Sequence, residues 1–252
     1  MKIVSYKFGL LPILVVALLF GCKKISDTKK AKSLNSDTSV DVEYKPWMDR
    51  FSSQFLNFEN TDKLALNNYD FIFIGSSMIE KWVTLSTDMA PLKVVNRGVG
   101  GATIREVIFY LEKLIGQRSP KAIVVYDGDN DISIMRDFGI DDSLNGEDIF
   151  HAFKILHRKI KLLYPKTKLI YISIKPAPAR ILTNYPEGII ANRLIKEYCS
   201  KEKDCSYIDV ATRMFDEKGN IISGIWQPDG NHFNNEGYKL WNSIIKPVLS
   251  NL

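Results

Sequence analysis

The sequence predicts a single α/β domain whose parallel sheet is covered by helices on both faces. From about residue 45 onward, short runs rich in Val and Ile alternate with amphipathic stretches, the order of a parallel sheet with crossover helices. These runs are apolar through most of their length, as in strands that are covered on both faces. The composition, 45% hydrophobic and 25% charged over 252 residues, is that of a globular protein able to bury a full core.

Five runs are the expected strands of this sheet: Phe71–Gly75, Lys93–Asn96, Ala122–Tyr126, Lys168–Ile174 and Tyr207–Val210. Helices are expected near 45–58, 102–115, 147–164, 187–200 and 235–249. The third helix has a plausible cap in Asn145 or Asp142, and Pro165 stops it. There is no internal repeat and no second linker, so we expect one domain over residues 43–252.

Residues 1–21 have the pattern of an export signal peptide. Lys2 and Lys7 precede an apolar run from Phe8 to Gly21. Fourteen apolar residues, at about 1.5 Å each, are too few to cross a hydrocarbon core roughly 30 Å thick. A buried core helix is the alternative, but the basic start at the extreme N-terminus favours a signal.

The run ends in Leu19-Phe20-Gly21-Cys22, which resembles the lipobox of bacterial lipoproteins. That resemblance implies that Cys22 is lipidated and becomes the new N-terminus. We therefore expect a protein of the bacterial cell envelope, exported and held by acyl chains on a membrane, facing the periplasm or the cell surface. The stretch 22–42 is rich in Lys, Ser, Asp and Thr without apolar periodicity, which predicts a flexible tether.

The net charge of +5 is concentrated near the N-terminus. The first 42 residues hold seven lysines and three aspartates, so the remainder is close to neutral. A neutral body argues against nucleic acid as a partner, because such proteins need clustered positive charge. The sequence does not indicate the oligomeric state.

Cys199 and Cys205 lie six apart, between a predicted helix and a predicted strand. In an oxidising compartment they could form a short-loop disulfide, and two free thiols are the alternative. No CxxC motif or Cys/His cluster indicates a metal site, and we expect neither a metal nor a cofactor.

Ligands of such sheets bind beyond the carboxyl ends of the strands, so the residues that follow each strand are the candidates. The first strand runs into Gly75-Ser76-Ser77, which exposes a hydroxyl at a strand-to-helix turn. A serine there is also a common helix cap. The segment is not the GxSxG elbow of the α/β-hydrolases, because residue 79 is Ile.

The second strand runs into a turn with three glycines, at 98, 100 and 101, whose backbone N–H groups can approach a ligand. A dinucleotide fingerprint would need glycine where Thr103 stands, so that interpretation fails. A turn without a ligand is the alternative.

The third strand runs into Asp127-Gly128-Asp129-Asn130-Asp131, an acidic spacing that suggests a calcium loop. Ile132 and Phe138 occupy the positions where an EF-hand needs Gly and Glu, which excludes an EF-hand but leaves a looser cation site open. Asn130 supplies an amide NH₂ that could point at a developing negative charge.

Near the C-terminus, Asp229 and His232 are three residues apart, within reach of one tight turn. This spacing lets the carboxylate accept from Nδ1–H while Nε2 acts as a base. His151 and His157 lie in a predicted helix, and we expect surface or packing roles for them. One Asp-x-x-His pair is a weak signal, but four such motifs in this order at one sheet edge are a strong one.

Together the motifs resemble the four ordered blocks of the SGNH (GDSL-like) hydrolases. GSSMIEKW resembles the first block, with Ser76 where Asp is commoner, and NRGVGGAT, YDGDND and PDGNHFNNEGY resemble the others. SIKPAPAR at 173–180 is similar to a stretch of bacterial members related to the platelet-activating-factor acetylhydrolases. The resemblance spans roughly Trp47 to Leu249. It implies a flavodoxin-like, three-layer α/β/α sandwich around a five-stranded parallel sheet.

The resemblance also implies roles for individual residues. Ser77 would be the nucleophile, His232 the general base, and Asp229 the residue that orients the imidazole. The backbone N–H groups of Ser77 and Gly101 and the side chain of Asn130 would form the oxyanion hole. Glycine at 101 would keep a side chain out of the acyl site. Ser76 stays open as an alternative nucleophile, although the block alignment favours Ser77.

Asp127 is more polar than the small residue expected in the third block, so it would either perturb His232 or face a polar substrate.

The implied function is a metal-independent serine esterase that removes a short acyl group, with acetyl as the expectation, from a carbohydrate or another small ester. No long apolar lid segment is present, which argues against long-chain lipids. Trp82 and Trp226 would either frame a sugar-sized pocket or lie in the core. The alternative is a catalytically inactive ligand-binding lipoprotein on the same fold, which predicts a disrupted block. A third interpretation, a structural lipoprotein, does not explain why the four blocks occur together in this order.

Overall fold

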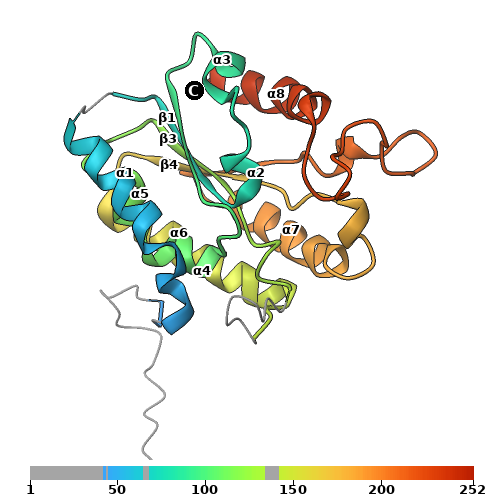
Figure 1. Ribbon diagram of the computed structural model, residues 1–252, viewed down its shortest axis with the longest axis horizontal. Coiled ribbons are helices and arrows are strands. Elements are labelled where there is room, and N and C mark those ends of the chain that lie inside the picture. The colour runs from blue at the N-terminus through green and yellow to red at the C-terminus, as the bar shows by residue number, and fades with distance from the viewer. Residues whose placement is uncertain (1–41, 44, 65–67, 134–141) are drawn as a thin grey trace, which may run out of the picture. The chain divides into compact units, whose positions relative to one another are not determined.

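A parallel sheet of five strands, in the order β2-β1-β3-β4-β5, forms the centre of the fold (Figure 1). The strands are β1 (Phe71–Gly75), β2 (Val94–Gly98), β3 (Ala122–Tyr126), β4 (Lys168–Ile172) and β5 (Cys205–Ile208). The structure is a computed structural model that describes residues 42–252 except 44, 65–67 and 134–141. The predicted signal peptide, Cys22 and the tether up to residue 41 lie outside the described residues.

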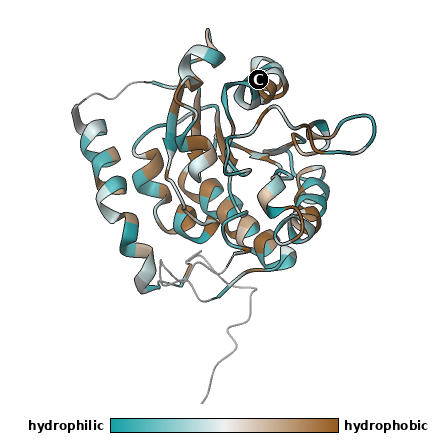
Figure 2. Ribbon diagram, turned by 45° about the vertical axis from the view of Figure 1, so that its right-hand side comes forward, coloured by the Kyte–Doolittle hydropathy of each residue, from teal (hydrophilic) through white to brown (hydrophobic). Residues whose placement is uncertain are grey.

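All five predicted strands are confirmed, with ends that shift by at most two residues. β1 and β3 are buried over their whole length, as their continuous apolar runs indicate. Successive side chains of a strand point to opposite faces, so each central strand contributes to two separate cores. Figure 2 shows the result, with hydrophobic residues gathered on the sheet and on the inner sides of the helices.

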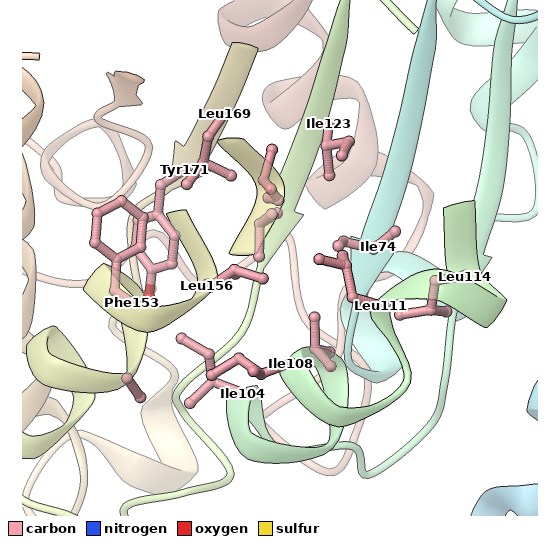
Figure 3. Close-up of a cluster of buried hydrophobic side chains, with 14 of the residues drawn as sticks. Ile74, Ile104, Ile108, Leu111, Leu114, Ile123, Phe153, Leu156, Leu169 and Tyr171 are labelled. Atoms are coloured by element: carbon pink, nitrogen blue, oxygen red, sulfur yellow. The ribbon is translucent and has the colours of Figure 1, made fainter. Parts of the chain in front are cut away.

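Helices cover both faces of the sheet. One face packs against α1 (Ser52–Leu64), α4 (Ile104–Phe109), α5 (Leu111–Ile115), α6 (Gly146–Leu163) and α7 (Tyr185–Cys199). Figure 3 shows this core, where strand residues such as Ile74, Ile123 and Tyr171 face helix residues such as Ile108, Leu111 and Phe153. The other face packs against α2 (Ser77–Glu80), α3 (Leu85–Met89) and α8 (Asn235–Ser250). The three-layer α/β/α sandwich is thus confirmed.

Three predicted helices differ in detail from the structure. The first is a 3₁₀ helix, η1 (Pro46–Phe51), that continues into α1, and the second is divided at Tyr110 into α4 and α5. Asn145, and not Asp142, caps α6, because its side chain accepts from the N–H of Asp148. The strand-to-helix turn predicted after the first strand is confirmed by α2, but the extent of α2 and the presence of α3 are not predicted, since four or five residues carry no helical periodicity.

Cys199 and Cys205 form a disulfide, which resolves the two alternatives that their spacing left open. The bond joins the last residue of α7 to the first residue of β5. Within the part of the chain that the structure describes, no helix combines the length and the hydropathy needed to span a bilayer.

Candidate active site

Three turns lie side by side at the carboxyl edge of the sheet. Gly75, the last residue of β1, is in register with Gly98 of β2 and Tyr126 of β3. Backbone bonds tie the turns together: the N–H of Ser76 donates to Tyr126 O at 3.2 Å, and the N–H of Val99 donates to Gly75 O at 2.8 Å. The sequence-predicted residues Ser77, Gly101 and Asn130 are carried by these three neighbouring turns.

Ser77 is the first residue of α2 and follows a sharp turn at Gly75. Gly75 has a φ of +130°, and a Cβ there would lie 1.9 Å from the carbonyl oxygen of Tyr126, so only glycine fits. The Ser77 hydroxyl lies 2.8 Å from His232 Nε2. Ser76 is buried, makes no side-chain capping bond, and its Oγ has no hydrogen-bond partner among the described residues. The geometry therefore favours Ser77 as the nucleophile over Ser76.

Asp229 and His232 lie on one tight turn that reaches Ser77 from far along the chain. Asp229 Oδ1 accepts from the N–H groups of Asn231 and His232, at 2.9 Å each, and Oδ2 lies 2.5 Å from His232 Nδ1. Because an ionised carboxylate only accepts, Nδ1 carries the proton and Nε2 is left to accept from the Ser77 hydroxyl. Burial raises the pKa of Asp229, but the hydrogen bonds from His232 and the turn outweigh it and hold that pKa well below its usual range.

Asn130 is 5% exposed, and its amide is bonded on both sides. Its Nδ2 donates to Ala102 O at 2.9 Å, and its Oδ1 accepts from Arg180 Nη1 at 3.1 Å. One N–H of the amide remains beyond these two bonds. The backbone N–H groups of Ser77 and Gly101 have no acceptor in the described part of the chain. Three unused donors thus lie on the turns that follow β1, β2 and β3.

The turn that carries Gly101 is held in place by Arg50 of η1. Arg50 Nη2 donates to Gly101 O at 2.8 Å, and the same guanidinium pairs with Glu106. Glu106 also accepts from the backbone N–H of Thr103, which closes a capping box at the start of α4. Gly101 has a φ of +80°, whereas a Cβ there would meet Phe51 at an ordinary 3.5 Å. The left-handed backbone conformation by itself favours glycine at this position, and the role of Gly101 in leaving room for the acyl group stays a prediction.

Sequence reasoning missed Arg50, Glu106, Lys175 and Arg180 as parts of this site. The spacing Thr103-x-x-Glu106 is a capping-box signal that could have identified Glu106. Lys175 and Arg180 lie in the family-like stretch 173–180, which could have identified them, whereas no local pattern indicates Arg50, 51 residues from Gly101.

The three aspartates after β3 do not form a cation site. Asp129 pairs with Lys175 and Arg180, and Asp131 pairs with Arg105. Asp127 accepts from the N–H of Gly128. In residues 42–252, outside the gaps named above, no group of three or more His, Cys, Asp or Glu residues is arranged to hold a metal ion.

Asp127 is fully buried and lies among other acids. Burial, with Asp131 as the next contributor, raises the pKa of Asp127 well above its ordinary value, and burial raises the pKa of Asp131 to about 6. Asp129 and Glu106 are the other charged groups that raise the pKa of Asp127. With no exposed surface, Asp127 does not face a substrate, so this alternative is wrong.

The remaining candidates are structural. Trp82 is fully buried and donates to Asp88, so of the two alternatives given for it, the place in the core is confirmed. Trp226 is partly buried, packs against Phe233 and donates to Ile222 O. His157 is buried between Tyr198 and Asp204, and His151 is exposed, as expected for packing and surface histidines.

Comparison with known proteins agrees with the geometry. The family model of the GDSL-like lipases and acylhydrolases matches residues 76–240, a range that contains Ser77, Gly101, Asn130, Asp229 and His232. No curated protein sequence matches the chain.

Solved structures of low sequence identity share the fold. A Streptococcus pneumoniae protein named for platelet activating factor superposes with a TM-score of 0.68 at 17% identity, over 81% of this chain and 94% of the other. A GDSL-like lipase from Bacteroides thetaiotaomicron gives 0.61 at 20% identity, over 81% and 97%. A mutant acetyl-xylooligosaccharide esterase from Geobacillus stearothermophilus gives 0.58 at 16% identity, over 72% and 94%. The chain belongs to the GDSL-like lipase/acylhydrolase family and is a carboxylic ester hydrolase.

Proposed function

We propose that the protein is a serine esterase that removes a short acyl group from a carbohydrate or another small ester. The acyl group that we expect is acetyl. The observation that carries the proposal is the continuous hydrogen-bonded chain from the Ser77 hydroxyl through His232 to Asp229. A serine hydroxyl is a weak nucleophile until a neighbouring base takes its proton, and this chain supplies that base.

In the proposed mechanism, His232 Nε2 takes the proton as Ser77 Oγ attacks the ester carbonyl. The negative charge that develops on the carbonyl oxygen is stabilised by the N–H groups of Ser77 and Gly101 and by Asn130 Nδ2. The intermediate then expels the alcohol, which receives the proton from His232. A water molecule, deprotonated by His232, hydrolyses the acyl-serine by the reverse sequence. The Asp229 carboxylate holds Nδ1–H and stabilises the imidazolium at both stages.

The exposure of the acid–base turn supports a substrate with a bulky alcohol part. The side chain of Asp229 is 46% exposed and that of His232 is 18% exposed, so this side of the site opens to solvent. An ester on a sugar or polymer can reach such a site from outside while only its acyl group enters. The acetyl-xylooligosaccharide esterase with the same fold agrees with this substrate class.

The test is hydrolysis of p-nitrophenyl esters of increasing chain length by the purified wild-type protein, with Ser77→Ala and Ser76→Ala as a matched pair. We expect the highest kcat/KM on acetate, its loss in Ser77→Ala, and near wild-type activity in Ser76→Ala. Unchanged turnover in Ser77→Ala would contradict the proposed mechanism. A folded wild-type protein that neither hydrolyses any ester nor reacts with a fluorophosphonate would indicate the inactive ligand-binding alternative.

We further propose that Cys22 is lipidated and anchors the enzyme to a membrane of the cell envelope. The basic start, the apolar run of fourteen residues and the lipobox-like Leu19–Cys22 support this proposal. In a bacterial host, the wild-type chain should incorporate labelled palmitate and sediment with membranes. Cys22→Ser should do neither, and label retained in Cys22→Ser would contradict the anchor.

A further inference from the structure

The segment Ser173–Arg180 follows β4 and contains none of the residues that react in the proposed mechanism. It nevertheless touches both sides of the site. The N–H of Ala179 donates to Gly230 O at 3.0 Å, and Lys175 Nζ donates to Asn231 Oδ1 at 3.3 Å, so the segment contacts the turn that carries Asp229 and His232. At its end, Arg180 donates to the side chain of Asn130.

Arg180 contacts both Asn130 and Asp129, and these contacts hold its guanidinium in place beside the Asn130 amide. Its Nη1 donates to Asn130 Oδ1 at 3.1 Å and to the backbone oxygen of Asp129 at 3.2 Å, and it lies 3.5 Å from the Asp129 carboxylate. Burial raises the pKa of Asp129, but Lys175 and Arg180 outweigh it and hold that pKa below its ordinary value, so the carboxylate is charged. The Arg180 side chain is 23% exposed, and its guanidinium therefore sits at the border between the core and solvent.

The contact with Arg180 determines which way the Asn130 amide faces. A carboxamide can turn by 180° and exchange its oxygen for its nitrogen. Ala102 O can only accept and a guanidinium can only donate, so the two neighbours together allow one orientation. In that orientation the NH₂ group lies on the side of the Gly101 turn. A hydrogen bond from a cation to Oδ1 also polarises the amide and strengthens its remaining N–H as a donor.

We propose that Arg180 is a positioning residue of the oxyanion hole: it acts on the reaction only through Asn130, by fixing and polarising the amide that donates to the oxyanion. This inference rests on the proposed function.

A double-mutant cycle on the purified protein tests the inference, with p-nitrophenyl acetate as the substrate. The four proteins are the wild type, Arg180→Met, Asn130→Ala and the double variant, and unfolding temperatures are measured for each. Because the amide remains bonded to Ala102 O, we expect Arg180→Met to lower kcat by about 10-fold, less than the loss of the donor itself, with KM changed less than about twofold. In the Asn130→Ala background the same substitution should change kcat less than about twofold. Arg180→Lys should restore part of the loss.

The matched control is Arg193→Met, which removes an exposed arginine of α7 and should leave kcat unchanged. A kcat loss from Arg180→Met that is as large with Asn130→Ala as without it would overturn the inference, and so would an effect on KM alone, which would mark a substrate contact. If Arg180→Met does not fold, the cycle is run with Arg180→Lys, which keeps a positive charge beside Asp129, and the same criteria decide. Hydrolysis that survives Ser77→Ala would overturn the proposed function instead.

Discussion

The two halves of the candidate site are built in different ways. In the oxyanion half, Asn130 is buried, Ser77 and Gly101 are half-buried, and the turn of Gly101 is held by Arg50, which pairs with Glu106. The acid–base half is a single turn at the surface, where the Asp229 side chain is 46% exposed. The turn of Gly101 is held by a contact between distant segments, whereas Asp229 and His232 are joined by hydrogen bonds within four residues, on a turn that Ala179 and Lys175 also contact.

The difference corresponds to what each half must do in the proposed mechanism. Donors for an oxyanion act best when they are fixed in advance and shielded from water, because their dipoles then need no reorganisation. A general base must exchange protons with a leaving alcohol and an incoming water, so it needs access to solvent. The comparison predicts that damage to the acid–base half abolishes the chemistry, whereas damage to the oxyanion half reduces its rate.

The largest effect is expected at His232. His232→Ala removes the base that takes the Ser77 proton, so kcat on p-nitrophenyl acetate should fall by about 10⁴-fold or more. The unfolding temperature is measured beside it, because this side chain is only 18% exposed and its removal also deletes packing contacts. His151→Ala, an exposed histidine of α6, is the control and should keep wild-type kcat. A fall of less than tenfold in His232→Ala would break the assignment of the acid–base half.

Asp229→Asn should have a smaller but still large effect. The amide of the new side chain can accept the two backbone hydrogen bonds of the turn, but it no longer stabilises a proton on His232 Nδ1. The imidazole is therefore no longer held in the required tautomer, and the imidazolium has no negative partner. We expect kcat to fall by about 10²–10⁴-fold, since the loss of a buried orienting aspartate costs about 10⁴ and this carboxylate is half exposed. Steady-state kinetics beside Asp216→Asn, an exposed aspartate of another turn, measures it; equal effects of the two would contradict the role of Asp229.

Asn130→Ala tests the oxyanion half. It deletes one donor of three, so kcat should fall by about 10²–10³-fold while Ser77 still reacts slowly with a fluorophosphonate. The rate of covalent labelling and the kcat on acetate should fall together, because both reactions place negative charge on an oxygen in the same hole. Loss of hydrolysis with unchanged labelling would show that Asn130 serves another step.

The smallest expected effect is on the pH dependence of the unfolding temperature. It concerns the buried carboxylic acids that follow β3, Asp127 in particular. The pKa of Asp127 is raised by burial, so its contribution to stability is complete below its unfolded pKa and is lost as the pH rises through the folded value. Asp127→Asn has no charge to bury, and relative to wild type it should raise the Tm by about 2–4 °C more at pH 8 than at pH 5. Glu217→Gln, at an exposed position, is the control. An equal change at both pH values would mean that Asp127 is ionised in the folded state.

The sequence predicted the layers and the reacting residues for reasons that lie in short segments. The apolar run of β3 identifies a buried strand, and Asp229 and His232 are joined by one turn whose spacing is visible in the chain. The turn at Ser77 predicts that a helix follows the first strand, but four residues show no period, so the extent of α2 could not be predicted. The contacts of Arg50 with Gly101 and of Arg180 with Asn130 join segments about 50 residues apart, and only the packed fold brings them together.

The most direct test of the central claim is the site at which the protein is modified by a fluorophosphonate, determined by mass spectrometry of peptides from the purified wild-type protein. Ser76 and Ser77 are adjacent, so fragmentation of one peptide distinguishes them. The account predicts a phosphonylated Ser77, with no adduct in Ser77→Ala and strongly slowed labelling in His232→Ala. An adduct on Ser76, or ester hydrolysis by a protein in which Ser77 stays unmodified, would contradict it.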